Sequence, residues 1–249
     1  MLEIKGLSKS FGGIVVADNI DLVMRPGRIL GLIGPNGAGK TSLFNLVSGL
    51  YAPNSGTVTL DGKPLDGLAL HERARLGLAR TWQHVRLFPS LSVIDNVIIG
   101  ARDYPAESLV TLMFRPSKVR SVAKAARAKA QDILARIGLP DSADKCIGDL
   151  PYGQQKLVGV TRALMNDAQC LLLDEPMAGV EGQAYEAMQR IVRDVAASGV
   201  AVCVVEHNIA FIRDLCDEAV FMFQGRILAR GSIAELIANP ELTELYFGH

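Results

Sequence analysis

The chain has 249 residues, 49% of them hydrophobic, which is enough for one large domain or two small ones with a substantial core. Its 26 Lys and Arg residues balance 26 Asp and Glu residues, so the formal net charge is zero. This balance argues against general nucleic-acid binding and a polybasic membrane anchor, since both need excess positive charge. No signal peptide is visible, and no apolar run approaches the roughly 20 residues that cross a bilayer. We therefore expect any membrane association to come through another chain.

The cysteine pattern does not indicate a disulfide framework. Cys146, Cys170, Cys203 and Cys216 include no CxxC pair. Cys170 and Cys203 lie in or beside strongly apolar runs, which is typical of small buried side chains. The pattern favours a reducing compartment such as the cytoplasm.

Three strand-like stretches occupy the first part of the chain. They are LEIKGLSKSF, GIVVADNIDLVM and SGTVTLDGKPL, and Gly, Asn and Asp residues interrupt or separate them. We expect these stretches to form a small antiparallel sheet that is attached to a larger core.

Short apolar runs alternate with amphipathic stretches elsewhere in the chain. The runs RILGLIG, CLLLDEP and VAVCVVEHN are apolar without alternation, as expected of parallel strands that are covered on both faces. Helical spacing occurs at 40–50 and 154–165. This order predicts an α/β domain with a mostly parallel sheet and a small N-terminal antiparallel β subdomain.

The segment from about 84 to 165 is predicted to be an inserted, largely helical subdomain. Pro116 and Ser117 can begin a helix that stops at Gly138 and Pro140. The basic residues of this helix form either a lipid- or partner-binding face or a solvated face, and the solvated face is the more ordinary interpretation. These residues are Lys118, Arg120, Lys124, Arg127, Lys129 and Arg136.

Residues 231–249 are predicted to form a C-terminal helical tail. Ser232 and Glu235 have the spacing of a capping box, and we expect Asn239-Pro240 to divide the tail into two short helices. We interpret residues 1–249 as one domain that contains the helical subdomain and this tail.

The stretch GPNGAGKT fits the phosphate-binding pattern G-x-x-x-x-G-K-[ST], and it follows a strand and opens a helix. Its glycines let the backbone curl so that successive N–H groups point inward, and the helix N-terminus adds positive potential. Lys40 can reach the β- and γ-phosphates of a nucleotide, and Thr41 can offer its hydroxyl to Mg²⁺. The predicted nucleotide-binding residues here are Gly34, Pro35, Asn36, Gly37, Ala38, Gly39, Lys40, Thr41 and Ser42.

Two adjacent carboxylates follow the apolar run at 171–173. The end of a buried strand delivers them to the edge where open α/β sheets bind ligands. Asp174 can hold Mg²⁺ through water, and Glu175 can orient or deprotonate an attacking water. Together with the phosphate loop, these carboxylates predict a P-loop NTPase with a RecA-like core. The guanine-reading pattern NKxD does not occur in the sequence, so adenine is favoured over guanine.

Three further stretches narrow this class. TWQ at 81–83 follows the phosphate loop, LPYGQQKLVGVTRAL precedes Asp174, and VVEHN places His207 at a strand end. The ordered set resembles the ATP-binding subunits of ABC transporters over essentially the whole chain. The resemblance implies an ATPase that binds ATP and Mg²⁺ and couples hydrolysis to solute translocation.

The resemblance also implies roles for individual residues. Phe11 would stack on adenine, although it could instead be a core residue of its strand. Gln83 would contact Mg²⁺ beside the surface that docks a membrane subunit. Glu175 would be the catalytic base and His207 a switch histidine near the γ-phosphate, although a histidine at a strand end is often structural. The helical subdomain would carry the signature motif that faces a second subunit's ATP, Leu150, Pro151, Tyr152, Gly153 and Gln154.

The sequence departs from the family pattern at several places. The usual signature is LSGGQ, and here Pro151 replaces Ser and Tyr152 replaces the first Gly. Glu181 ends the D-loop at 178–181 where Asp or Asn is usual. Glu206 is a second candidate for the base, but Glu175 is preferred because it directly follows the Mg²⁺ carboxylate.

Several stretches resemble the ATPase subunits of branched-chain amino acid importers. They are RTWQHVRLFPSLSVIDNVIIG, LPYGQQ, an insertion around 102–118 and the ending NPELTELYFG. This resemblance implies a second ATPase subunit, the same or different, and two transmembrane permeases at the cytoplasmic face of the inner membrane. A periplasmic solute-binding protein would deliver branched-chain or other amino acids, amides or urea.

Two alternatives remain open. The chain could serve an exporter or a system that extracts lipid or lipopolysaccharide. A soluble ABC protein that remodels a macromolecule is less favoured, because such proteins usually carry two ATPase halves or a large coiled-coil insertion.

Overall fold

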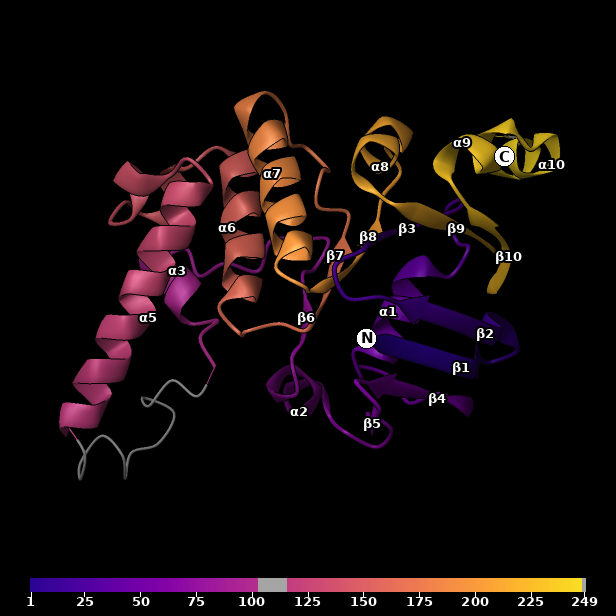
Figure 1. Ribbon diagram of the computed structural model, residues 1–249, viewed down its shortest axis with the longest axis horizontal. Helices are drawn as coiled ribbons and strands as arrows, with labels where there is room; N and C mark the ends of the chain where they lie inside the picture. The colour runs from indigo at the N-terminus through magenta and orange to yellow at the C-terminus, as the bar shows by residue number, and fades with distance from the viewer. Residues whose placement is uncertain (103–115, 248–249) are drawn as a thin grey trace. The chain divides into compact units, whose positions relative to one another are not determined.

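The computed structural model describes residues 1–102 and 116–247 (Figure 1). The predicted insertion around 102–118 therefore lies largely outside the described residues. Within the two described ranges, no helix combines the length and the apolar character that a membrane crossing needs.

The chain divides into two compact units. The first, called the sheet unit here, contains both sheets, and the second, called the helical unit, contains the predicted helical segment at about 84–165. The sheet unit comprises Met1–Arg80, Gln169–Pro176 and Val192–His249, and the helical unit comprises Thr81–Ala168 and Met177–Ile191.

A six-stranded sheet with the order β10-β9-β3-β8-β7-β6 forms the centre of the sheet unit. All neighbouring strands are parallel except β9 and β10, which confirms the predicted mostly parallel sheet. Every residue of β3, β7 and β8 is buried, and this explains their unbroken apolar sequence. The strands are β3 (Ile29–Ile33), β6 (Leu78–Arg80), β7 (Cys170–Asp174), β8 (Ala201–Val205), β9 (Glu218–Phe223) and β10 (Arg226–Gly231).

The predicted antiparallel sheet is also confirmed. Its strand order is β2-β1-β4-β5, and all three pairs are antiparallel. Leu2, Ile4 and Leu7 of β1 are buried, whereas the residues between them are more exposed, so one face of the sheet turns inward. The strands are β1 (Leu2–Phe11), β2 (Ile14–Met24), β4 (Ser55–Leu60) and β5 (Lys63–Pro64).

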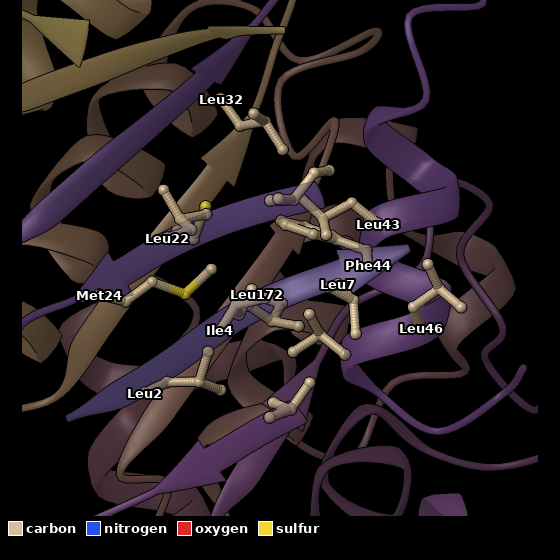
Figure 2. Close-up of a cluster of buried hydrophobic side chains, with 14 of the residues drawn as sticks. Leu2, Ile4, Leu7, Leu22, Met24, Leu32, Leu43, Phe44, Leu46 and Leu172 are labelled. Carbon is tan, nitrogen blue, oxygen red and sulfur yellow. The ribbon is translucent and has the colours of Figure 1, made fainter. Parts of the chain in front are cut away.

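One hydrophobic core joins both sheets to helix α1 (Lys40–Val47). Figure 2 shows Leu43, Phe44 and Leu46 of α1 among side chains of β1 and the larger sheet. Phe44 is fully buried, and burial of such a side chain contributes about 1.5–3 kcal/mol. Packing in this core therefore holds in place the helix that follows the phosphate loop.

The two predicted core cysteines lie in this same unit. Cys170 and Cys203 are buried, and both are free thiols. Burial raises the pKa of the Cys170 thiol to about 12, so this group stays protonated at neutral pH. Both behave as small apolar residues of the core, as predicted.

Packed helices form the helical unit. Helix α5 (Pro116–Arg136) matches the predicted span and packs on α3 (Val93–Ile98) and α6 (Tyr152–Leu164), as Figure 1 shows. Two of the α5 basic residues form ion pairs, Arg127 with Asp144 and Lys129 with Asp167. Short 3₁₀ turns at Pro140–Ser142 and Ile147–Asp149 connect α5 to α6, and α7 (Gln183–Ala197) begins in this unit.

The C-terminal tail has the predicted structure. The Ser232 hydroxyl accepts the Glu235 N–H, and the Glu235 carboxylate accepts the Ser232 N–H, which completes the capping box. Helix α9 (Ile233–Ala238) ends at Asn239, and α10 (Pro240–Phe247) begins at the proline. The remaining helices of the sheet unit are α2 (Leu70–Arg75) and α8 (Ile209–Leu215).

Candidate nucleotide-binding and hydrolysis site

The phosphate loop connects the end of β3 to the start of α1. At Gly34, φ is 150°, and a Cβ would lie 2.0 Å from the Met222 carbonyl oxygen. At Gly39, φ is 103°, and a Cβ would lie 2.4 Å from the Val16 carbonyl oxygen. A side chain at either position would strike the backbone of a neighbouring strand, so the loop requires glycine here.

The middle of the loop is more open. Gly37 has φ 79° with no atom within 4 Å of its Cβ position, so its glycine is needed for backbone conformation alone. Asn36 is exposed, Pro35 is partly exposed, and the N–H of the buried Ala38 donates to the Pro35 carbonyl. The Ala38 carbonyl accepts the Gly225 N–H, which fastens the loop to the turn between β9 and β10.

Lys40 begins α1 with its side chain folded into the loop. Its Nζ donates to the carbonyl oxygens of Gly34 at 2.6 Å and Pro35 at 2.9 Å, and the residue is buried. Burial lowers the pKa of the Lys40 ammonium, and the carboxylates of Glu175 and Asp174 partly oppose that effect. In the same first turn, Thr41 is exposed and Ser42 is partly exposed.

Asp174 ends β7 and forms a buried ion pair. Its Oδ2 lies 3.0 Å from Nη2 of Arg80, and the two side chains are 2% and 5% exposed. Nη1 of Arg80 also donates to Asn45 Oδ1 at 2.7 Å and to Ser48 Oγ at 2.9 Å. The Arg80 guanidinium thus connects Asp174 to helix α1, the helix that follows the phosphate loop.

Arg80 is a site residue that sequence reasoning did not identify. It lies on β6, three positions before Gln83, and its guanidinium stands 5.7 Å from the centre of the Phe44 ring. A planar donor group with several N–H bonds can hold both a carboxylate and a helix side chain in fixed positions. The sequence offers only a weak signal for it, a charged residue directly before the TWQ stretch, and no strand is predicted at 78–80.

Glu175 follows Asp174 and turns its side chain toward the end of β8. Its backbone has φ 47°, and its N–H donates to the Val205 carbonyl at 2.9 Å. Its Oε1 lies 3.0 Å from Nε2 of His207, and the two side chains are 17% and 40% exposed. The Glu175–His207 pair is therefore partly open to solvent, as a group that acts on a bound ligand must be.

Glu206 is placed differently. It is 4% exposed, and its Oε2 accepts the backbone N–H of His207 at 3.1 Å. The Asn208 side chain caps α8 by accepting the Phe211 N–H, so His207 lies between a strand and a helix start. Greater exposure and the contact with His207 favour Glu175 over Glu206 as a reacting group.

Phe11 lies at the end of β1 and is 41% exposed. Its ring makes an edge contact with Tyr51, with centroids 5.3 Å apart, and Lys9 Nζ stands 4.9 Å from its centre. The alternative that Phe11 is a core residue is therefore wrong. An exposed aromatic face is available for a planar ligand.

The helical unit holds Gln83 and the predicted signature. Gln83 is exposed, and its carbonyl accepts the Lys156 ammonium of α6 at 2.9 Å. Pro151 occupies the N-cap of α6, so the helix begins two residues before the predicted 154. The Pro151 carbonyl accepts the backbone N–H groups of Gln154 and Gln155. The carbonyl of the buried Leu150 accepts an N–H of the Gln155 side-chain amide.

Tyr152 replaces a glycine of the usual signature and packs on the D-loop. A Cβ at Gly179 would lie 3.1 Å from the Tyr152 ring, and a Cβ at Gly153 would lie 3.3 Å from Ala184. Tyr152 is itself 47% exposed, and Glu181 is exposed. The predicted signature and the predicted D-loop are therefore neighbours within the helical unit.

A mostly parallel sheet with a phosphate loop after β3 and carboxylates at the end of β7 is the arrangement of a P-loop NTPase. The chain belongs to the ABC transporter family, whose model matches residues 17–178. It is therefore an ABC ATPase subunit, as the sequence predicted.

Individual relatives are similar over nearly their full length. The high-affinity branched-chain amino acid transport ATP-binding protein LivG of Salmonella typhimurium is 32% identical, with 100% of this chain and 98% of that protein covered. The lipopolysaccharide export system ATP-binding protein LptB of Acidithiobacillus ferridurans is 31% identical, with 100% and 97% covered. The ADP conformation of an ATP-binding cassette from an ABC transporter has a TM-score of 0.84 at 28% identity, with 100% and 99% covered.

Proposed function

We propose that this chain is the ATP-hydrolysing subunit of a membrane importer for branched-chain or other amino acids. The full-length similarity to a branched-chain amino acid transport ATP-binding protein is the observation that carries the proposal. The contact between Glu175 and His207 beside a phosphate loop supports the hydrolytic part.

ATP would bind with its phosphates in the loop and its adenine on Phe11. The ammonium of Lys40 now bonds two loop carbonyls, and phosphate oxygens are stronger acceptors that would compete for it. The exposed Phe11 ring offers a stacking surface. These features support binding of an adenine nucleotide.

Mg²⁺ fits the oxygen donors that the sheet unit offers. The exposed Thr41 hydroxyl is a hard oxygen ligand of the kind that this ion prefers, and the Asp174 carboxylate would hold the ion through water. We propose Gln83 as a third contact. When bound, the ion would neutralise charge on the β- and γ-phosphates.

Glu175 would accept the proton of the attacking water. His207, 3.0 Å from that carboxylate, would hold it in place and face the γ-phosphate. Positioning and charge stabilisation account for most of the catalysis in phosphoryl transfer, and a carboxylate and an imidazole held in fixed positions would contribute to both.

The signature residues would act on the ATP of a second ATPase subunit. ATP held between two subunits binds the closed pair better than the open pair, and this difference in affinity can drive two permease subunits. We place the chain at the cytoplasmic face of the membrane, with a periplasmic solute-binding protein as an indirect partner.

Lipopolysaccharide export is the second candidate, because LptB is 31% identical over nearly its whole length. Purification of the chain from native membranes, with identification of the bound subunits, distinguishes amino-acid import from lipopolysaccharide export. Co-purification with two amino-acid permeases supports import. Co-purification with an exporter's membrane subunits overturns the import proposal.

A further inference from the structure

The C-terminal tail contacts the predicted switch histidine. The Tyr246 hydroxyl of α10 donates to the backbone carbonyl of His207, with an O–O distance of 3.2 Å. The two residues are 39 positions apart in the sequence. Tyr246 lies in the stretch NPELTELYFG near the end of the chain.

Side chains bond both backbone polar groups of His207. Its N–H donates to the Glu206 carboxylate, and its carbonyl accepts the Tyr246 hydroxyl. The peptide after β8 is thus held by two side-chain bonds on opposite sides of one residue. Backbone held in this way sets the direction of the His207 Cα–Cβ bond, and the imidazole at its end contacts Glu175.

Tyr246 is itself well fixed. Its ring centroid lies 6.3 Å from that of the buried Phe221 on β9, with an angle of 57° between the rings. Burial raises the pKa of the Tyr246 hydroxyl, and the nearby Glu206 carboxylate adds to this effect, so the hydroxyl keeps its proton. The donor is therefore present at neutral pH.

The rest of α10 has its own anchors. The Thr243 hydroxyl donates to the carbonyls of Ile237 at 2.9 Å and Asn239 at 3.0 Å, which ties α10 to α9. Leu242 is buried. The helix can therefore stay in place when the Tyr246 hydroxyl alone is removed.

We propose that Tyr246 is a positioning residue for ATP hydrolysis, which holds the His207 carbonyl so that the imidazole faces Glu175. The inference rests on the proposed roles of Glu175 and His207. It gives the Tyr246 hydroxyl alone, among the groups of the C-terminal helix, a positioning role in hydrolysis, and that hydroxyl does not touch ATP.

The test compares Tyr246→Phe with Thr243→Val in the full chain. Tyr246→Phe keeps the ring on Phe221 and removes one hydrogen bond, so we expect kcat for ATP to fall about 3- to 10-fold. KM and the affinity for ATP stay within about twofold, because no group of the phosphate loop changes. Thr243→Val also removes a hydroxyl from α10, and it keeps the kcat of the unaltered protein.

A second measurement reports the histidine directly. The Cε1–H resonance of His207, assigned by its loss in His207→Gln, is expected to shift or broaden in Tyr246→Phe and to stay in place in Thr243→Val. An unchanged resonance together with an unchanged kcat in Tyr246→Phe would overturn the proposal. An equal loss of kcat in Thr243→Val would also overturn it, because tail packing alone would then explain the effect.

One further variant separates this inference from the proposed site. If His207→Ala loses hydrolysis while Tyr246→Phe does not, only the role of Tyr246 fails. If the His207→Ala variant hydrolyses ATP at the normal rate, the proposed role of His207 is wrong, and the proposed role of Tyr246 is then wrong as well.

Discussion

Oε1 of Glu175 lies 3.0 Å from Nε2 of His207, at the ends of two adjacent parallel strands, β7 and β8. The register pairs Asp174 with Val205, so the two residues leave the sheet at nearly the same level. The contact places a carboxylate and an imidazole together without any long loop. The proposed hydrolytic role of the site rests on this geometry.

We expect Glu175→Gln to reduce ATP hydrolysis by at least about 100-fold, because the amide cannot accept a proton from water. ATP affinity is expected to stay the same, since Gln keeps the size of the side chain and an oxygen for His207. Steady-state phosphate release and equilibrium nucleotide binding measure the two effects.

The control for this variant is Glu206→Gln. Glu206 is buried and bonds the His207 backbone, so its loss should alter hydrolysis less than the loss of the base. Normal ATP hydrolysis by the Glu175→Gln variant would contradict the assignment of Glu175 as the base and would leave Glu206 as the remaining candidate.

Lys40→Ala is expected to weaken ATP binding by about 10- to 100-fold, because a charge-assisted hydrogen bond contributes roughly 1.5–3 kcal/mol. The measurement is the dissociation constant of ATP at fixed Mg²⁺. Lys63→Ala, at an exposed position of β5, serves as the matched control. Equal affinities in the Lys40 variant and the control would contradict the phosphate-loop assignment.

Removal of Arg80 is expected to destabilise the sheet unit strongly. Arg80→Met removes the guanidinium that pairs with the buried Asp174 carboxylate, which lowers the free energy of unfolding by about 3–5 kcal/mol. Urea unfolding measures the change. If Asp174 holds Mg²⁺ as proposed, bound Mg²⁺ and ATP should recover part of the loss, because the ion would balance the same carboxylate.

An exposed pair of the same chemistry provides the comparison. Arg127 and Asp144 are 2.9 Å apart with side chains 46% and 84% exposed, and Arg127→Met should change the unfolding free energy by less than about 1 kcal/mol. Similar small effects in both variants would mean that the Arg80 guanidinium does not hold Asp174.

The fold and much of the site could be predicted because their signals are local. The apolar runs before Gly34 and Asp174 predict buried strands, and GPNGAGKT contains the whole phosphate loop. Arg80 and Tyr246 form hydrogen bonds with residues 94 and 39 positions away, Asp174 and His207. No spacing rule relates such pairs, since tertiary packing alone brings them together.

Pro151→Ser tests the departure from the usual signature. Pro151 is the N-cap of α6 with φ −53° and ψ 148°, a conformation that serine adopts readily. Serine would add a side-chain acceptor for an N–H of the first turn, which stabilises a helix by about 1 kcal/mol, and a hydroxyl for the opposing subunit's γ-phosphate. We therefore expect the ATPase rate of the assembled complex to stay the same or rise. Pro151→Ala, which lacks the hydroxyl, is the control, and a severe loss in both variants would mean that proline is required at the start of α6.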